Sequence, residues 1–124
     1  MARETVEQTL NAYYTALNDL APDAFVDTFA PDAVSNDPVG APPNEGHAGI
    51  RQFINGIAGA FSKVSMSQDF TSIAGDRAAV KWTVNGTMAN GRSVTFEGID
   101  VFELGPDGKI QRLWGYWDPS VLAG

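Results

Sequence analysis

Residues 80–104 read VKWTVNGTMANGRSVTFEGIDVFEL, the pattern of an antiparallel β-hairpin. Val80, Trp82 and Val84 alternate with polar residues, as in a strand with one buried face. The dipeptide Asn90-Gly91 is the strongest short signal for a two-residue hairpin turn, and a second alternating strand follows it. The stretch therefore predicts two long strands joined by a tight turn.

Further strands are predicted on both sides of this hairpin. The pattern becomes β from about Val64, and Gly105-Pro106-Asp107-Gly108 forms the next turn. A last strand is expected over residues 110–117. Together these segments predict about four antiparallel strands in the second half of the chain.

The first half is predicted to be mainly helical. Apolar residues recur at helical spacing at positions 6, 10, 13, 17 and 20, which predicts a helix over about 4–20. Pro22 is well placed to begin a second, short helix that Pro31 closes, and a short strand is expected over 33–36. Residues 37–46 hold three prolines and two glycines and must form a loop. A third helix follows, with an apolar stripe at Ile50, Phe53, Ile54, Ile57 and Phe61. This order predicts a single α+β domain, residues 1–124, in which helices cover one face of a curved sheet.

The composition excludes several classes of function. Eight Lys and Arg against 15 Asp and Glu give a net charge of −7, which argues against nucleic acid or an anionic membrane as partner. The chain has no cysteine and a single histidine, His47, so thiolate and multi-histidine metal sites are not expected. The first residues carry acids where a signal peptide needs basic residues, and a cytoplasmic protein is expected.

Asp100 is the most informative single residue. On its strand it shares a face with Phe96 and Phe102, while Ile99 and Val101 lie on the other face. If the phenylalanine face is the concave one, burial would keep the Asp100 carboxyl protonated and able to donate a hydrogen bond. The alternatives are a pairing with Lys81 or a solvated face.

Asp37 and Tyr13 are weaker candidates when taken alone. Asp37 begins the proline-rich loop, where an Asx-turn needs no function. Tyr13 lies on the apolar stripe of the first helix beside Tyr14, where core packing is the default. The tryptophans Trp82, Trp114 and Trp117 belong to the core or line an apolar pocket, and the pattern does not separate these uses.

Taken together, these residues resemble the steroid Δ-isomerases (ketosteroid isomerases) of the nuclear-transport-factor-2-like, or SnoaL-like, fold. The resemblance runs from about Tyr13 to Trp117. Four segments carry it, namely Phe29-Ala30-Pro31-Asp32-Ala33, Asp37-Pro38-Val39-Gly40-Ala41-Pro42-Pro43 with Gly46, Ile99-Asp100-Val101, and Gly108-Lys109-Ile110-Gln111 with Tyr116-Trp117. It implies a cone-shaped curved antiparallel sheet with three N-terminal helices packed on its concave face.

The resemblance also implies a site. Its general base falls on Asp37, its protonated aspartic acid on Asp100 and its oxyanion-hole tyrosine on Tyr13. The supporting tyrosines of some members fall on Phe29 and Ile54, which leaves Tyr13 without their hydrogen bonds. The implied pocket is lined by Phe29, Phe53, Ile54, Phe96, Gly115 and Trp117, with Gly115 leaving room for a flat substrate.

The activity implied is a steroid Δ5-3-ketoisomerase-like proton transfer through a dienolate, with no metal or organic cofactor. Two alternatives stay open: a polyketide-cyclase-like enzyme acting on another ketone, and a non-catalytic module that binds a small apolar ligand. An epoxide-hydrolase-like site would need an arginine between two carboxylates, and no arginine is clearly placed there. An outer sheet face with Ile99 and Val101, joined by Trp82 or Trp114, predicts a homodimer.

Overall fold

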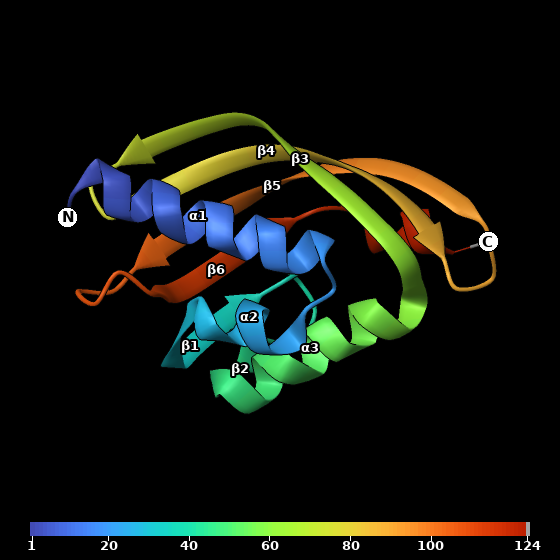
Figure 1. The fold of residues 1–124 in the computed structure, drawn as a ribbon, viewed down its shortest axis with the longest axis horizontal. Coiled ribbons are helices and arrows are strands. Elements are labelled where there is room, and N and C mark those ends of the chain that lie inside the picture. The colour runs from blue at the N-terminus through green and yellow to red at the C-terminus, as the bar shows by residue number, and fades with distance from the viewer. Residues whose placement is uncertain (124) are drawn as a thin grey trace.

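The computed structural model describes residues 1–123 as an open, curved sheet with three helices. Figure 1 shows that the three helices belong to the first half of the chain and that the long strands of the sheet follow them. The elements are α1 (Arg3–Asn18), α2 (Pro22–Asp27), β1 (Phe29–Asn36), β2 (Asn44–Glu45), α3 (Gly46–Ala60), β3 (Phe61–Ala74), β4 (Arg77–Met88), β5 (Ser93–Leu104), β6 (Ile110–Tyr116) and the 3-10 helix η1 (Pro119–Leu122). The predicted α+β architecture is confirmed.

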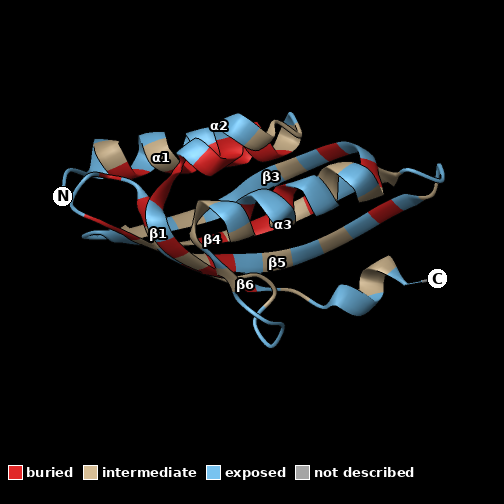
Figure 2. Cartoon of the chain, turned by 90° about the horizontal axis from the view of Figure 1, so that it is seen from below, coloured by how far each residue is buried: buried red, intermediate tan, exposed pale blue. Residues whose placement is uncertain are grey.

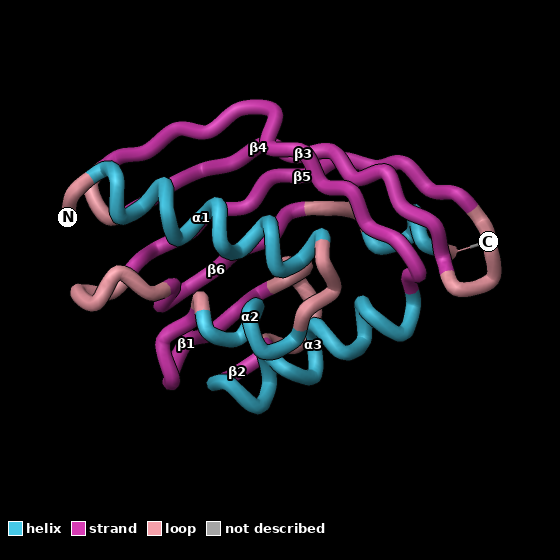
Figure 3. The backbone as a smooth tube through the Cα atoms, in the orientation of Figure 1, coloured by secondary structure: helices cyan, strands magenta, loops and turns pink. Residues whose placement is uncertain are grey.

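The sheet has the strand order β2-β1-β6-β5-β4-β3. All neighbouring pairs are antiparallel except β1 and β6, which run parallel. The long strands β3, β4 and β5 bend together, and all three helices lie on the inner side of that bend (Figure 1, Figure 3). The helices therefore cover the concave face of the sheet.

The central hairpin has the predicted inward face, but its turn takes three residues, 89–91, instead of the two of Asn90-Gly91. The register is therefore shifted by one residue from the one that a two-residue turn predicts, which would have paired Lys81 with Asp100. Val80 pairs with Asp100 and Val84 with Phe96 across β4 and β5. Val80 and Phe102 are fully buried, whereas Ile99 on the opposite face is 45% exposed. The face that carries Asp100 is therefore the concave one.

The structure differs from the predicted elements at several points. A short strand, β2, pairs with β1 inside residues 37–46, so the prediction of a loop over that whole stretch is wrong. The first strand begins at Phe29, and Pro31 lies inside it instead of closing a helix. This strand tolerates a proline because its register to β6 shifts between Phe29 and Val34. The third helix ends at Ala60, and Phe61 already begins β3.

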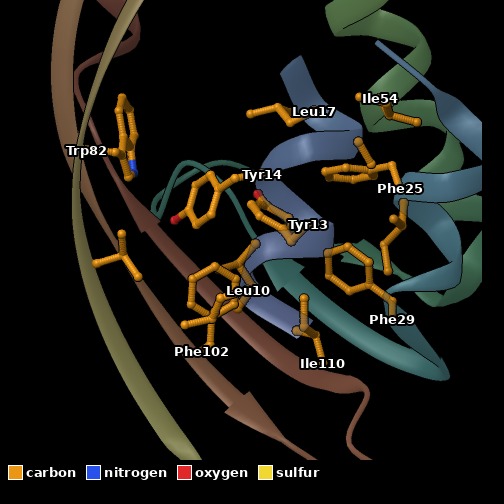
Figure 4. Close-up of a cluster of buried hydrophobic side chains, with 14 of the residues drawn as sticks. Leu10, Tyr13, Tyr14, Leu17, Phe25, Phe29, Ile54, Trp82, Phe102 and Ile110 are labelled. Carbon is orange, nitrogen blue, oxygen red and sulfur yellow. The ribbon is translucent and has the colours of Figure 1, made fainter. Parts of the chain in front are cut away.

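A cluster of aromatic and aliphatic side chains fills the space between α1, α2 and the sheet (Figure 4). Tyr13 lies at its centre, with its ring 5.0 Å from that of Phe25 and 5.2 Å from that of Phe102, between ring centroids. Figure 2 shows that each helix buries one side and exposes the other, as an amphipathic helix on a sheet does. This packing holds α1 against the sheet and so places its tyrosines.

Candidate active site

An apolar pocket opens between the helices and the concave face of the sheet. It holds about 500 Å³ of space free of protein atoms, its open mouth included. The lining comprises Tyr13, Leu17, Asp37, Phe53, Ile57, Phe61, Val64, Met66, Trp82, Val84, Phe96, Asp100, Trp117 and Leu122. Asp37 and Asp100 are the only acids in this lining, so two carboxyls face an otherwise apolar space.

Asp100 is held by strand β5 among the phenylalanines. Its side chain is 2% exposed, and its Oδ2 accepts a hydrogen bond of 2.6 Å from the Tyr14 hydroxyl. Burial, with the nearby Asp37 carboxyl adding to it, raises the pKa of Asp100 to about 8. The Tyr14 O–H and the Trp82 N–H act in the opposite direction and lower this pKa. Asp100 is therefore a neutral acid at neutral pH.

Lys81 does not pair with Asp100. It sits opposite Ile99 on the convex face, where its Nζ contacts Asp69 Oδ2 at 2.9 Å and Glu97 Oε2 at 3.0 Å. The predicted alternative of a Lys81–Asp100 pair is thus wrong. The reason is register: successive residues of a strand point to opposite faces, and Val80, not Lys81, faces inward beside Asp100.

Asp37 lies at the end of β1, where the chain enters the proline-rich loop through a cis Asp37-Pro38 peptide. Its Oδ1 accepts a hydrogen bond of 2.7 Å from the Trp117 indole N–H. Burial raises the pKa of Asp37 to about 6, while the Trp117 N–H lowers it. Asp37 is consequently ionised at neutral pH.

Gly115 on β6 brings the two carboxyls together. A Cβ at this position would overlap Asp37 Oδ1, lie 2.7 Å from Asp37 Cγ and lie 3.3 Å from Asp100 Oδ1. The missing side chain thus makes room for Asp37 rather than only for a substrate. Both carboxyls point to the same small region over β6.

Tyr13 reaches this region from α1. Its side chain is 2% exposed, and its hydroxyl makes no hydrogen bond to any other group of residues 1–123, although Tyr13 lines the pocket. Burial, together with the Asp100 and Asp37 carboxyls, raises its pKa well above the ordinary value. Figure 4 shows the Tyr13 and Tyr14 hydroxyls directed differently, with that of Tyr14 toward the sheet. The Tyr13 O–H is therefore a protonated donor without a protein acceptor.

The structure brings most of the predicted residues together. Tyr13, Asp37 and Asp100 line one pocket, and Phe53, Phe96 and Trp117 line it with them. Phe29 and Ile54 do not line it: both belong to the buried core, where the Phe29 ring lies 5.9 Å from that of Tyr13, between centroids, and Ile54 of α3 is fully buried. The prediction that Phe29 and Ile54 line the pocket is therefore wrong.

Two functional contacts escaped the prediction: Tyr14 bonds to Asp100, and Trp117 bonds to Asp37. For Trp82 both the pocket and the outer sheet face were open, and the structure places it in the pocket. The Trp82 orientation is visible in the pattern, because Trp82 alternates in phase with Val80 and Val84. The bonds of Tyr14 and Trp117 join residues 86 and 80 positions apart, and no local signal indicates them.

Residues 1–123 contain no group of three or more His, Cys, Asp or Glu side chains that could hold a metal ion. No helix in this part of the chain is long and apolar enough to cross a membrane.

The chain matches known proteins over most of its length. The model of the SnoaL-like domain matches residues 10–113. The chain belongs to the SnoaL-like family. This SnoaL-like chain is 33% identical over 117 residues to the steroid Delta-isomerase of Nocardioides simplex, a match covering 94% of this chain and 93% of the isomerase. The resemblance to steroid Δ-isomerases is thereby confirmed.

Solved structures show the same fold. SalBIII, an epoxide hydrolase/cyclase-like enzyme with a role in pyran ring formation in the polyether salinomycin, is 28% identical and superposes with a TM-score of 0.84, over 94% of this chain and 93% of SalBIII. RV0760c from Mycobacterium tuberculosis superposes with a TM-score of 0.85 over 98% of this chain and 96% of its own, at 15% identity. The second likeness concerns the fold alone.

Proposed function

We propose that this protein is a steroid Δ5-3-ketoisomerase-like enzyme that moves a carbon–carbon double bond into conjugation with a ketone. The observation that carries the proposal is the difference in protonation among three side chains that line one apolar pocket. Asp37 is ionised, whereas Asp100 and Tyr13 keep their protons at neutral pH. One base and two acids then face the same substrate.

The reaction is an internal proton transfer. The Asp37 carboxylate removes a proton from the carbon between the ketone and the double bond, and the electron pair of that C–H bond moves to the carbonyl oxygen to form a dienolate. Tyr13 and neutral Asp100 donate hydrogen bonds to this oxygen. Asp37 then returns the proton to the far carbon of the conjugated system, so no atom is gained or lost. This division between two carboxyls is the one already known for ketosteroid isomerases.

The energetics favour this use of the site. A hydrogen bond aimed at a developing oxyanion in a dry site contributes about 3–4 kcal/mol to the stabilisation of the transition state. Asp37 has its pKa just below neutrality, where a general base is most useful. We expect activity to rise as Asp37 ionises near pH 6 and to fall as Asp100 loses its proton near pH 8.

A cyclase-like reaction on another ketone is the second candidate, and the likeness to SalBIII supports it. Such an enzyme would keep Asp37 as its acid or base without requiring both Tyr13 and Asp100. The lining of the described pocket contains no Arg or Lys, so an epoxide-opening site with an arginine between two carboxylates receives no support.

We also propose that the protein forms a homodimer through the convex face of the sheet. Phe70 is 68% exposed there, Ile99 is 45% exposed and Tyr116 is 50% exposed. Ile99 and Tyr116 are paired neighbours on β5 and β6. Lys81 lies between Phe70 and Ile99 in the same cross-strand row, so the exposed apolar side chains stand on either side of a charged one. Exposed apolar side chains are costly to leave in water, and a second copy on this face would cover them.

The isomerase proposal is tested with a β,γ-unsaturated 3-ketosteroid, whose conjugated product is followed by its absorbance. We expect turnover by the wild type, near-complete loss in Asp37→Asn and a strong loss in Asp100→Leu. Full activity of Asp37→Asn would contradict the mechanism. Turnover of another ketone that needs Asp37 but not Asp100 would favour the cyclase-like candidate.

A further inference from the structure

The Tyr14 hydroxyl lies behind the proposed donors and is not used in the reaction described above. It is 2% exposed, and its single hydrogen bond in the described chain goes to Asp100 Oδ2 at 2.6 Å. If Asp100 were the donor in this contact, the Tyr14 proton would have no acceptor in a buried place, which is costly. The Tyr14 hydroxyl is therefore the donor and Oδ2 the acceptor.

This bond leaves Oδ1 as the free oxygen of Asp100. Oδ1 lies 3.3 Å from the position of a Cβ on Gly115, beside the Asp37 carboxyl. It therefore faces the region where the proposed reaction takes place. A neutral carboxyl with its Oδ2 held by a donor carries its proton on the other oxygen.

We propose that Tyr14 is a positioning residue: its hydroxyl holds Oδ2 of Asp100 and so directs the Asp100 proton to Oδ1, on the side of Asp37 and the substrate. This inference rests on the proposed function for its role in catalysis, but the orientation of the carboxyl is a separate claim.

Every group facing Asp100 enters its titration. Tyr14 and Tyr13 face it from α1, Asp37 from the end of β1, and Trp82 from β4. The nearest cation on the neighbouring strand, Lys81, points to the opposite face. In the described chain no cation therefore neutralises the charge of ionised Asp100. Burial raises the Asp100 pKa, and the hydrogen-bond donors Tyr14 and Trp82 lower it.

Trp82 supports the idea of a site built around this carboxyl. Its indole lies against Gly98, where a Cβ would come within 2.5 Å of Trp82 Cζ2. Its Nε1 is buried without a hydrogen-bond partner of good geometry, although it lies near enough to Asp100 to lower the Asp100 pKa. The short bond from Tyr14 is thus the one that fixes the orientation of the carboxyl.

The test compares Tyr14→Phe with Tyr116→Phe, a matched control at an exposed position on the convex face. Carbon NMR of protein labelled at aspartate, assigned with Asp100→Asn, gives the Asp100 pKa without any substrate. Loss of a donor to the charged form should raise this pKa by roughly 1–2 units in Tyr14→Phe and leave it unchanged in Tyr116→Phe. An unchanged Asp100 pKa in Tyr14→Phe overturns the proposal.

Two further measurements separate positioning from a structural role. In Tyr14→Phe, kcat at neutral pH should fall about ten- to a hundredfold with little change in KM, while the alkaline limit of activity moves to higher pH. Binding of 2-naphthol, a phenol that mimics the oxyanion, should weaken by a similar factor. Unchanged naphthol affinity, or a fall in kcat without the alkaline shift, counts against positioning.

The outcomes keep the two proposals apart. If the wild type shows no isomerase activity, the proposed function fails, yet the NMR titration and naphthol binding still decide the role of Tyr14. If Tyr14→Phe does not fold, the wild-type Tyr14 hydroxyl proton provides the answer by NMR. It should resonate far downfield and shift with the Asp100 titration, and a resonance that ignores that titration overturns the proposal.

Discussion

Replacing Asp100 by Asn should make the protein more stable at neutral pH, and increasingly so as the pH rises. An aspartate in the unfolded chain has a pKa of about 3.9, whereas burial raises that of Asp100 to about 8 in the folded protein. Between these values the folded state keeps a proton that the unfolded state has released. The contribution of Asp100 to the free energy of unfolding therefore falls by about 1.4 kcal/mol for each pH unit.

The magnitude follows from this slope. From pH 5 to pH 7 the wild type should lose nearly 3 kcal/mol relative to Asp100→Asn, and by pH 7 the accumulated difference since pH 4 is about 4 kcal/mol. Asparagine does not titrate, and its oxygen can still accept the Tyr14 hydrogen bond while its amide occupies the place of the protonated oxygen. The variant thus removes the titration with little change of shape.

Urea unfolding of both proteins at pH 5, 6 and 7 measures the difference directly. Asp69→Asn is the control: the hydrogen bonds from Thr83, Lys81 and Ser67 lower the Asp69 pKa to about 2, so this group is ionised throughout the window. The difference between that variant and the wild type should stay constant. Parallel stability curves for the wild type and Asp100→Asn would refute a raised Asp100 pKa, and with it a neutral Asp100 as donor.

Three other predictions concern the rest of the site and the sheet. In Gly115→Ala the new Cβ overlaps the Asp37 carboxyl, so turnover should fall at least a hundredfold. Circular dichroism should show that the fold is retained. Normal turnover would show that Asp37 is not where the structure places it. In Trp117→Phe the Asp37 pKa rises for want of the indole N–H, and the acid limit of the pH–rate profile should move up by roughly one unit; an unmoved limit contradicts Asp37 as the base. Ile99→Lys places a charge on the exposed convex face and should shift the mass measured by light scattering from that of a dimer to that of a monomer. A monomeric wild type would refute the proposed homodimer.

Much of the fold follows from local patterns. Alternation with period two along residues 80–104, with a turn at Asn90-Gly91, suffices to predict the β4–β5 hairpin, and it also places Asp100 on the face of Phe102. The helical stripes predict α1 and α3, since each buries one side. These features depend on residues that lie close together in the sequence, so the local sequence pattern is enough to predict them.

The composition of the site could also be predicted, though only through resemblance. Asp37, Asp100 and Tyr13 are each ambiguous alone, since a turn, a salt bridge or core packing explains them equally well. Their joint match to one family selects the three residues. Phe29 and Ile54 show the weakness of this route, because a matching position in the family does not ensure a place on the pocket wall.

The tertiary structure alone decides how these groups are oriented and charged. A shift of one residue in strand register would have turned Lys81 toward Asp100 and ionised it, and only the observed pairing of Val80 with Asp100 excludes this. Both Tyr13 and Tyr14 point inward because α1 is packed between the sheet and α2, so the second tyrosine reaches Asp100 while the first faces the pocket. Patterns along the chain specify which face a residue occupies, whereas the proton of a buried carboxyl depends on groups within a few ångströms in space, and those come from remote parts of the sequence.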